Sequence, residues 1–331
     1  MEELSRFNLM GSSPVFKETV SRIHRMGHLD ATVLIMGETG TGKELAARAI
    51  HYLGSRTEKP FVPVNCGALS ESLVESELFG HERGAFTDAK TASQGLIGEA
   101  SGGTLFLDEI DALTPKAQAS LLRFLQDRTY RRVGGGGIRQ VDVRVIVASN
   151  ADLSALAVQR SFRLDLLYRL NVLTLTMPPL RSRQDDSVII AKSILRRLSH
   201  QYRVPCKDLH ADALSFIRSY SWPGNVRELE NVIHREFLMS EESVLRLHDS
   251  RRILQGEPIA EISPVNTTLA FREAKARAVA DFERSYVADL LRRTEGNISH
   301  AARMAMQDRS AFGKMVRKYG LESGEVENRS A

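Results

Sequence analysis

The sequence lacks any long run of apolar residues. The longest, residues 31–36 and 143–148, are far shorter than the ~20 residues that a helix needs to cross a bilayer. The N-terminus, MEELSRFNLM, carries no apolar signal segment either. We therefore expect a cytoplasmic protein with no membrane insertion.

Cysteine is also scarce, and the absence of common metal-site motifs and of Pro- or Gly-rich composition excludes several protein classes. The only two cysteines, Cys66 and Cys206, form no C-x-x-C pair, so we expect two free thiols, with a single long-range disulfide as the alternative. The nine histidines never take the H-E-x-x-H spacing of a zinc site. With 10 Pro, 23 Gly and 42% hydrophobic residues, the chain is neither collagen-like nor disordered. Its 331 residues predict about two globular domains.

Short β-rich segments alternate with helix-like segments between about residues 31 and 176. Strands are expected at 31–36, 61–65, 104–107, 141–149 and 171–177. Continuous apolar strands separated by longer amphipathic segments are typical of a parallel sheet that is covered on both faces. The sequence therefore predicts an α/β fold over residues 1–185.

Beyond residue 186 the strand signals end and helical periodicity takes over. Residues 186–254 are expected to form a small helical subdomain, followed by a linker at 255–270 that has Pro, Gly and small polar residues but no period. Residues 271–331 are expected to form a small all-α domain. Its first helix carries an apolar stripe of Val279, Phe282, Tyr286, Val287, Leu290 and Leu291.

A glycine-rich loop stands between the strand at 31–36 and a following helix. In such a loop the glycines let the backbone wrap a phosphate, while N–H groups and a lysine supply positive potential. ATP is therefore the predicted cofactor. Glu44 stands where a Ser or Thr normally holds Mg²⁺. The residues of this P-loop, all expected to lie at the nucleotide, are Gly37, Glu38, Thr39, Gly40, Thr41, Gly42, Lys43 and Glu44.

A second strand, TLFL at 104–107, ends in two acids. Asp108 is expected to bind Mg²⁺, directly or through water, and Glu109 to orient the attacking water. Adjacent acids at a strand end are often only a solvated corner. Because a P-loop lies upstream, we favour the first interpretation, in which the two acids serve an ATPase that uses ATP and Mg²⁺.

Residues 8–245 resemble the AAA+ domain of the NtrC-like bacterial enhancer-binding proteins, ATPases that activate sigma-54 RNA polymerase. The run ELFGHERGAFTDA is the most specific part of the resemblance, because general AAA+ proteins lack it. The matching segments are GETGTGKE (37–44), NCGAL (65–69), ELFGHERGAFTDA (77–89), GGTLFLDEI (102–110), FRLDLLYRLNV (162–172), PPLRSR (178–183) and WPGNVRELEN (222–231).

The resemblance implies further roles around the nucleotide. Asn65 would be a switch residue that pairs with Glu109; an ordinary turn-capping asparagine is the alternative. Asn150 would be a first sensor of the γ-phosphate, and Arg227 a second sensor in the helical lid.

The resemblance also implies that the active site is shared between subunits. Arg163 and Arg169 would be arginine fingers that reach the nucleotide of the adjacent subunit, so that activity requires a ring, by resemblance a hexamer. An ion pair with Asp165 is the alternative for Arg163, as is a solvated helical arginine pair for both.

The resemblance marks residues 84–89 as the signature loop that contacts sigma-54. Phe86 and Thr87 are expected at its exposed tip, with burial of Phe86 in the core as the alternative, and Asp88 replaces the family's second Gly. Asp88 motivates a second hypothesis, a DNA-binding regulator or remodelling ATPase that no longer contacts sigma-54; a general AAA+ motor acting on DNA is a third. The loop comprises Gly84, Ala85, Phe86, Thr87, Asp88 and Ala89.

A second loop, residues 128–139, is expected to lie beside the signature loop and to move with it. Its four glycines predict mobility. Its four arginines, for which the loop has no compensating acid, are Arg128, Arg131, Arg132 and Arg139.

Residues 296–321 resemble the Fis-type helix-turn-helix of the same family. Asn297 or Ser299 is expected to cap the first short helix, while Met306 and Gln307 occupy the turn where the family places Gly and an apolar residue. The helix at 271–293 would form a dimer interface; a solvated helical bundle is the alternative to DNA binding. The recognition helix at 309–319 offers Arg309, Ser310, Lys314, Arg317 and Lys318 to DNA.

Charge and length complete the expectations. The net charge of +4 is concentrated in residues 291–320, where seven Lys or Arg and two Asp or Glu give 7 − 2 = +5. This marks the segment expected to bind DNA. The first strand begins near residue 31, which leaves no room for a sensing domain before it. The expected partners are sigma-54 RNA polymerase, enhancer DNA, further copies of the chain and a separate regulatory protein.

Overall fold

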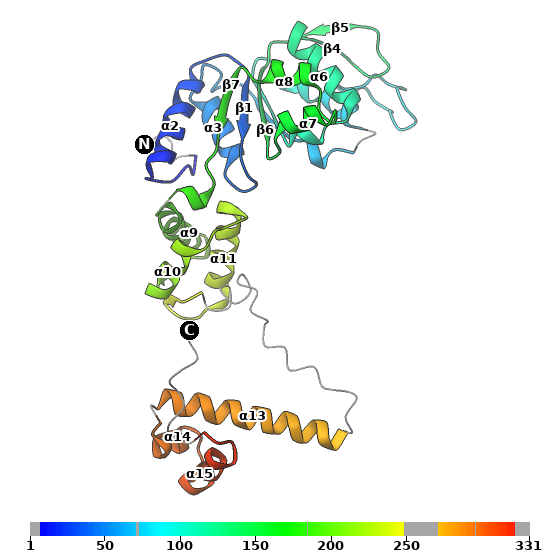
Figure 1. The fold of residues 1–331 in the computed structure, drawn as a ribbon. Helices are drawn as coiled ribbons and strands as arrows, with labels where there is room; N and C mark the ends of the chain where they lie inside the picture. Colours follow the sequence, from blue (N-terminus) through cyan, green and yellow to red (C-terminus); the bar gives the residue numbers. More distant parts are fainter. Residues whose placement is uncertain (1–6, 71–72, 184, 248–270, 295, 322–331) are drawn as a thin grey trace. The chain divides into compact units, whose positions relative to one another are not determined.

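The chain divides into two units, Met1–Arg251 and Arg252–Ala331 (Figure 1). The computed structural model describes residues 7–321 except 71–72, 184, 248–270 and 295. No helix in this described part is long and apolar enough to cross a membrane. Both cysteines are free thiols, as expected, and burial raises the pKa of Cys66 to about 12.

The first unit is built on a parallel sheet of five strands in the order β2-β3-β6-β1-β7. All five predicted strands form, and the predicted strand at 141–149 begins only at Arg144. This confirms the α/β parallel-sheet fold. The strands are β1 (Val33–Met36), β2 (Phe61–Asn65), β3 (Thr104–Asp108), β6 (Arg144–Ser149) and β7 (Leu173–Thr176).

Two apolar cores cover the two faces of this sheet. Alternate residues of β6 enter different cores: Val145 and Val147 face one, Ile146 and Ala148 the other. Because both faces are buried, the strands read as continuous apolar runs. One face is covered by α2 (Pro14–Gly27) and α3 (Lys43–Tyr52). The other core takes residues from α4 (Val74–Phe79), α5 (Gly95–Glu99), α6 (Pro115–Asp127), α7 (Leu153–Val158) and α8 (Leu164–Leu170).

The helical lid follows β7 and the 3₁₀ turn η3 (Leu180–Ser182). It contains α9 (Asp186–Tyr202), α10 (Ala211–Ser219) and α11 (Asn225–Met239). The expectation that no strand follows residue 186 is wrong in one detail. Two short parallel strands, β8 (Asp208–Leu209) and β9 (Val244–Leu245), pair with each other because the ends of the lid segment lie side by side.

The second unit consists of α13 (Phe271–Arg293), α14 (Ile298–Met304) and α15 (Arg309–Lys318). The predicted apolar stripe on α13 is only partly buried. Val287 and Leu290 are buried among α14 and α15, whereas Val279, Phe282 and Tyr286 are exposed. The six buried core residues are Val287, Leu290, Ala301, Ala302, Phe312 and Val316.

Candidate nucleotide site and contact loops

The P-loop has the backbone form that its glycines predict. Gly40 and Gly42 adopt left-handed φ values of 78° and 96°, which favour glycine. The Lys43 ammonium lies over the loop and donates to the carbonyl oxygens of Gly37 (2.8 Å) and Glu38 (3.2 Å). Burial lowers the pKa of Lys43, and the charges of nearby acids oppose that shift. The loop therefore presents a largely buried cation beside its N–H groups.

The acids at the end of β3 lie on the same side of the sheet as the P-loop. Asp108 accepts a hydrogen bond from the backbone N–H of Glu109 (3.0 Å), and Glu109 has a left-handed φ of 53°. The negative charges of Asp108, Glu109 and Asp111 all act on Lys43. Sequence reasoning missed Asp111, which accepts a 2.6 Å hydrogen bond from Ser149 on the neighbouring strand β6.

The donor set suits a magnesium ion that is held mainly by phosphate and water. Among the described residues, no three His, Cys, Asp or Glu side chains gather as a metal cage. Mg²⁺ commonly needs only one or two carboxylates besides phosphates and water. Asp108, next to Lys43 and at the end of a central strand, is in position to supply one.

Asn65 makes the turn-capping bond that was the alternative interpretation, and its pairing with Glu109 stays a prediction. Asn65 ends β2 and caps the 3₁₀ turn η1 (Cys66–Ala68), where its Oδ1 accepts from the N–H of Ala68 (3.1 Å). This is the turn-capping alternative. Glu109 remains close, because a Cβ added to Gly67 would lie 2.3 Å from Glu109 Oε2 and 3.3 Å from Asn65 Oδ1.

The two predicted sensors flank the P-loop from different elements. Asn150, which follows β6, donates from Nδ2 to the Thr39 hydroxyl (3.1 Å). Arg227 is exposed in the first turn of α11, and its Cβ would lie 3.1 Å from a Cβ built on Gly40. Burial lowers the pKa of Lys43, and the positive charge of Arg227 adds a smaller effect in the same direction.

Glu44 and Glu38 do not point where the sequence suggested. The Glu44 side chain is exposed on α3 and pairs with Arg48 one turn later (2.8 Å), because residues four apart share a helix face. The Glu44 side chain is thus engaged on α3, and the expected place of this residue at the nucleotide stays a prediction. The Glu38 carboxylate is bound by Arg181 (2.7 Å) and Asn225 (3.1 Å), two residues that sequence reasoning missed although both lie in segments that carry the family resemblance.

The predicted arginine fingers are held within the single chain. Arg163 donates to both carboxylate oxygens of Asp165 (3.0 and 2.6 Å), the ion pair that was the alternative interpretation. Arg169 donates to the backbone carbonyl of Leu125 (3.1 Å). Both guanidinium groups therefore lie on the surface formed by α6 and α8, and Leu164 and Tyr168 beside them are exposed apolar residues.

The signature loop is closed by its own backbone. Gly84 N donates to Ala89 O (2.8 Å), and Ala89 N donates to Phe86 O (3.0 Å). Phe86 is half-buried, with its ring edge against His81 (centroids 5.0 Å apart), which corrects the expectation of a fully exposed tip. Thr87 and Asp88 are exposed, and Asp88 does not have a positive φ, so an L residue fits here without backbone strain.

The second loop lies against the signature loop, as expected. It forms a hairpin of β4 (Thr129–Arg131) and β5 (Ile138–Gln140), and Glu82 N donates to Val133 O (3.0 Å). The expectation that its arginines lack a compensating acid is wrong. Glu82, just before the signature loop, pairs with Arg132 (3.1 Å) and Arg139 (3.7 Å).

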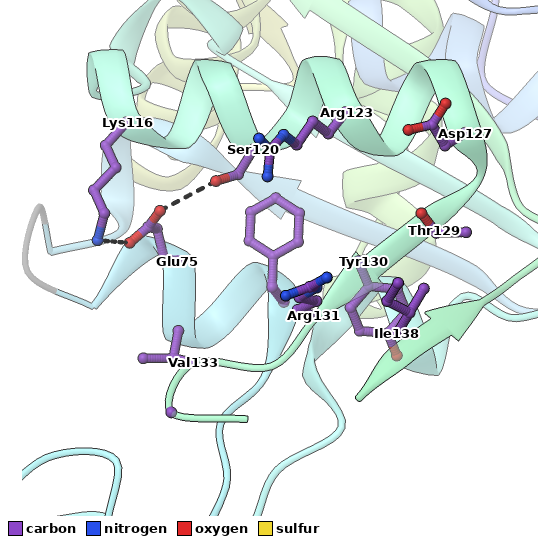
Figure 2. Close-up of a pocket in the computed structure, with 12 residues that line it drawn as sticks. Glu75, Lys116, Ser120, Arg123, Asp127, Thr129, Tyr130, Arg131, Val133 and Ile138 are labelled. Atoms are coloured by element: carbon purple, nitrogen blue, oxygen red, sulfur yellow. Dashed lines mark hydrogen bonds and ion pairs between the residues drawn. The ribbon is translucent and has the colours of Figure 1, made fainter. Parts of the chain in front are cut away.

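A hollow of about 640 Å³ lies between α4, α6 and this hairpin (Figure 2). Lys116 and Ser120 of α6 both bond to Glu75 of α4 at one side of it. Arg123 and Arg131 extend into it from α6 and β4 (Figure 2). Sequence reasoning did not predict this hollow, because its walls come from three separate segments.

The helix-turn-helix forms despite its unusual turn. Asn297 caps α14 by accepting from the N–H of His300 (3.1 Å). Met306, in the turn where the family places Gly and an apolar residue, has a left-handed φ of 49°, and its side chain is 96% exposed. The predicted DNA-contact residues that are exposed on α15 and make no ion pair in the described chain are Arg309, Ser310, Lys314 and Arg317.

Lys318 is a partial exception among the predicted DNA contacts. Its ammonium pairs with Glu283 of α13 (2.9 Å), and the Tyr319 hydroxyl donates to the same carboxylate. These bonds hold the pKa of Glu283 below its usual value. Lys318 therefore connects α15 to α13, and its expected contact with DNA stays a prediction.

Comparison with known proteins settles the family. Residues 9–176 match the sigma-54 interaction domain, and residues 181–261 match an AAA+ ATPase lid domain. The chain belongs to the sigma-54 interaction domain family. This confirms the resemblance drawn from the signature run and the nucleotide motifs. The sigma-54 interaction domain thus holds the P-loop, the β3 acids and both contact loops.

Two curated relatives show how far the similarity extends. The chain is 40% identical over 319 residues to the regulatory protein AtoC of Escherichia coli (strain K12), covering 96% of this chain and 69% of AtoC. It is 41% identical over 320 residues to the nitrogen fixation protein AnfA of Azotobacter vinelandii, covering 97% of this chain and 59% of AnfA. The chain thus spans about two thirds or less of their lengths.

Solved structures of NtrX from Brucella abortus share the fold. One is 31% identical with a TM-score of 0.70, and the similarity covers 96% of this chain and 70% of that one. Another, in complex with ATP, is 30% identical with a TM-score of 0.66 and covers 94% and 68%.

Proposed function

We propose that this chain is an ATPase that activates transcription by sigma-54 RNA polymerase. The observation that carries the proposal is that one unit combines a P-loop after β1, two acids at the end of β3 in the same sheet and a closed signature loop. Family membership supports both the ATPase activity and the interaction with sigma-54. Energy from hydrolysis would drive the contact loops to remodel the closed promoter complex.

The residues at the P-loop have distinct roles in this proposal. Lys43 leaves the loop carbonyls and neutralises the β- and γ-phosphates, and Glu109 orients the attacking water. Asp108 would hold Mg²⁺, which neutralises charge between the phosphates when bound. Asn150 and Arg227 contact the γ-phosphate from two sides of the loop.

Arg163 and Arg169 complete the site of an adjacent subunit. Arg163 pairs with Asp165 of α8 and Arg169 donates to Leu125 O of α6, and neither bonds to the P-loop of its own chain in the described residues. A ring, by family resemblance a hexamer, would bring them to the neighbour's nucleotide. An arginine supplied in this way raises phosphoryl transfer by roughly 10³ to 10⁵.

The second unit would bind enhancer DNA as a dimer. Arg309, Ser310, Lys314 and Arg317 are exposed on α15, and the exposed stacked pair of Phe282 and Tyr286 on α13 offers an apolar dimer face. Control by a separate regulatory protein is part of this proposal.

The signature loop provides the decisive test. Thr87→Ala should retain the wild-type ATPase rate and lose open-complex formation in sigma-54-dependent transcription with purified components. Thr57→Ala, an exposed threonine away from the loop, serves as the control and should retain both. Intact transcription activation by Thr87→Ala would refute the role of the loop.

Asp88 supports one rival function, a DNA-bound regulator that has lost sigma-54 contact. Its exposed carboxylate adds a charge at the tip of the loop. The rival predicts that the chain, trapped with a transition-state nucleotide analogue, fails to bind sigma-54, and that Asp88→Gly restores binding. Our proposal predicts binding by the unaltered chain.

A further inference from the structure

The Glu38 carboxylate lies at the P-loop but is directed to the lid. Arg181, in η3, donates to both of its oxygens, and Asn225 Nδ2 donates to Oε2 (3.1 Å). The hydrogen bonds from Arg181, then from Asn225, lower the pKa of Glu38 to about 2. Glu38, Arg181 and Asn225 are called the Glu38 network below.

Asn225 connects three segments of the chain within this network. It is fully buried and has a left-handed φ of 54°, a conformation that asparagine tolerates better than most residues. Its Nδ2 also donates to Thr39 O (3.0 Å), and its Oδ1 accepts from the N–H of Leu180 (2.8 Å). The side chain therefore joins the P-loop, η3 and the start of α11.

The backbones of the P-loop and the lid also interlock at this point. Val226 N donates to Gly40 O (3.0 Å). A Cβ on Gly40 would lie only 2.3 Å from Gly224 O, so the loop approaches the lid as closely as glycine allows. A movement of the lid at this place must therefore move the P-loop.

The network also has an electrostatic consequence. A P-loop binds a highly charged phosphate anion, and a carboxylate at its second position would repel that anion. In this chain Arg181 offsets that charge, and Asn225 donates a further hydrogen bond to the carboxylate.

We propose that Arg181 and Asn225 are positioning residues for the nucleotide: they hold the Glu38 carboxylate against the lid, neutralise it and fix the P-loop to α11. The proposal rests on the proposed ATPase function. It predicts that loss of Arg181 weakens nucleotide binding because the negative charge of Glu38 is then no longer neutralised. Removal of that charge should restore the affinity.

The test measures binding of a fluorescent ADP analogue and steady-state ATP hydrolysis by the full chain. Arg181→Gln should raise the Kd and the KM for ATP about three- to tenfold, with a smaller change in kcat, because uniform binding is lost. Adding Glu38→Gln to Arg181→Gln should return the Kd to within about twofold of Glu38→Gln alone. The defect of Arg181→Gln should also shrink as salt is added, since both side chains are partly exposed.

Asn225→Asp tests the buried member of the network. Aspartate has the size of asparagine and also tolerates the left-handed backbone. An ionised aspartate at this position, however, has no N–H to donate to Glu38, and it places a second carboxylate against that residue. It should raise the Kd more than Arg181→Gln does, and Glu38→Gln should partly restore binding. Arg197→Gln, which removes an exposed lid arginine paired with Glu230, is the matched control and should bind as wild type.

The outcomes separate this proposal from the ATPase function. Wild-type affinity in Arg181→Gln, or a defect that Glu38→Gln leaves unchanged, would overturn the role of the network while the ATPase function stands. Failure of the unaltered chain to bind ADP or to hydrolyse ATP would overturn both.

Discussion

Arg183 and Asp186 form an ion pair that is shielded from water at the start of the lid. Their side chains are 3% and 1% exposed, and Arg183 Nε lies 3.1 Å from Asp186 Oδ2. Asp186 also accepts from the N–H groups of Ser12 (2.6 Å) and Ser13 (3.0 Å), and the Arg183 guanidinium lies 3.7 Å over the ring of Phe16. The pair thereby attaches the segment before α2 to the lid.

Replacing Arg183 by Met should cost the first unit much of its stability. Removal of one partner leaves a buried carboxylate without its countercharge, which costs about 3–5 kcal/mol of unfolding free energy. The lid offers a matched control in Arg197→Met, because the Arg197–Glu230 pair is 47% and 44% exposed. Loss of an exposed pair should cost about 1 kcal/mol or less.

The single tryptophan provides the assay. Trp222 is 1% exposed in the lid, with its ring edge-to-face with Tyr220 (5.0 Å), so its fluorescence reports unfolding of the first unit alone. With a urea m-value of about 1–3 kcal/mol/M, a loss of about 3–5 kcal/mol in Arg183→Met should lower the midpoint by about 1–5 M. Equal midpoints for Arg183→Met and Arg197→Met, at unchanged m, would refute the argument from burial.

Two further predictions follow from the same reasoning. Burial alone would raise the pKa of Asp186, but its hydrogen bonds and Arg183 lower it. The contribution of Asp186 to the free energy of unfolding is therefore fully present above the unfolded pKa of about 3.9. It is lost as the pH falls through the lower pKa of the folded state. Urea midpoints between about pH 5 and pH 3 should fall less steeply in Arg183→Met than in the unaltered chain, and parallel curves would contradict this. Met306→Gly should stabilise the second unit by up to about 1 kcal/mol. A non-glycine residue in the left-handed conformation costs roughly 1–2 kcal/mol, and the larger backbone entropy that glycine loses on folding offsets part of the relief. Thermal unfolding followed by circular dichroism checks it, with Met304→Gly at the last residue of α14 as a control that should not stabilise the unit. No difference between the two variants would count against strain at Met306.

The parts of the molecule that the sequence predicted are those with local causes. The five strands follow from apolar runs buried on both faces, and the P-loop from glycines between a strand and a helix. The partner of a charge is not a local property. Glu82 meets Arg132 across 50 residues, and Glu38 meets Arg181 across 143. Motif recognition located these segments, but only the folded chain shows which side chains in them meet.

Met306 shows a different limit of sequence reasoning. The family's glycine suggested that the turn needs a residue free to adopt positive φ, and the structure gives that conformation to methionine. The cost is confined to the backbone, because the side chain is 96% exposed and displaces nothing. A missing glycine therefore signals strain at this turn, not loss of the turn.

Lys43, Asn150 and Glu38 at the P-loop have internal partners, and the kind of partner decides which bonds a nucleotide can replace. Lys43 donates to loop carbonyls and Asn150 to the Thr39 hydroxyl. These acceptors are neutral, so a phosphate oxygen, which carries charge, makes the stronger bond and displaces them. Glu38 differs because Arg181 neutralises its carboxylate and Asn225 donates to it. A phosphate that displaced these bonds would leave an unpaired carboxylate next to itself, which is unfavourable. Nucleotide binding should therefore redirect Lys43 and Asn150 while the Glu38 network stays closed, which leaves the lid attached to the P-loop as the phosphates bind.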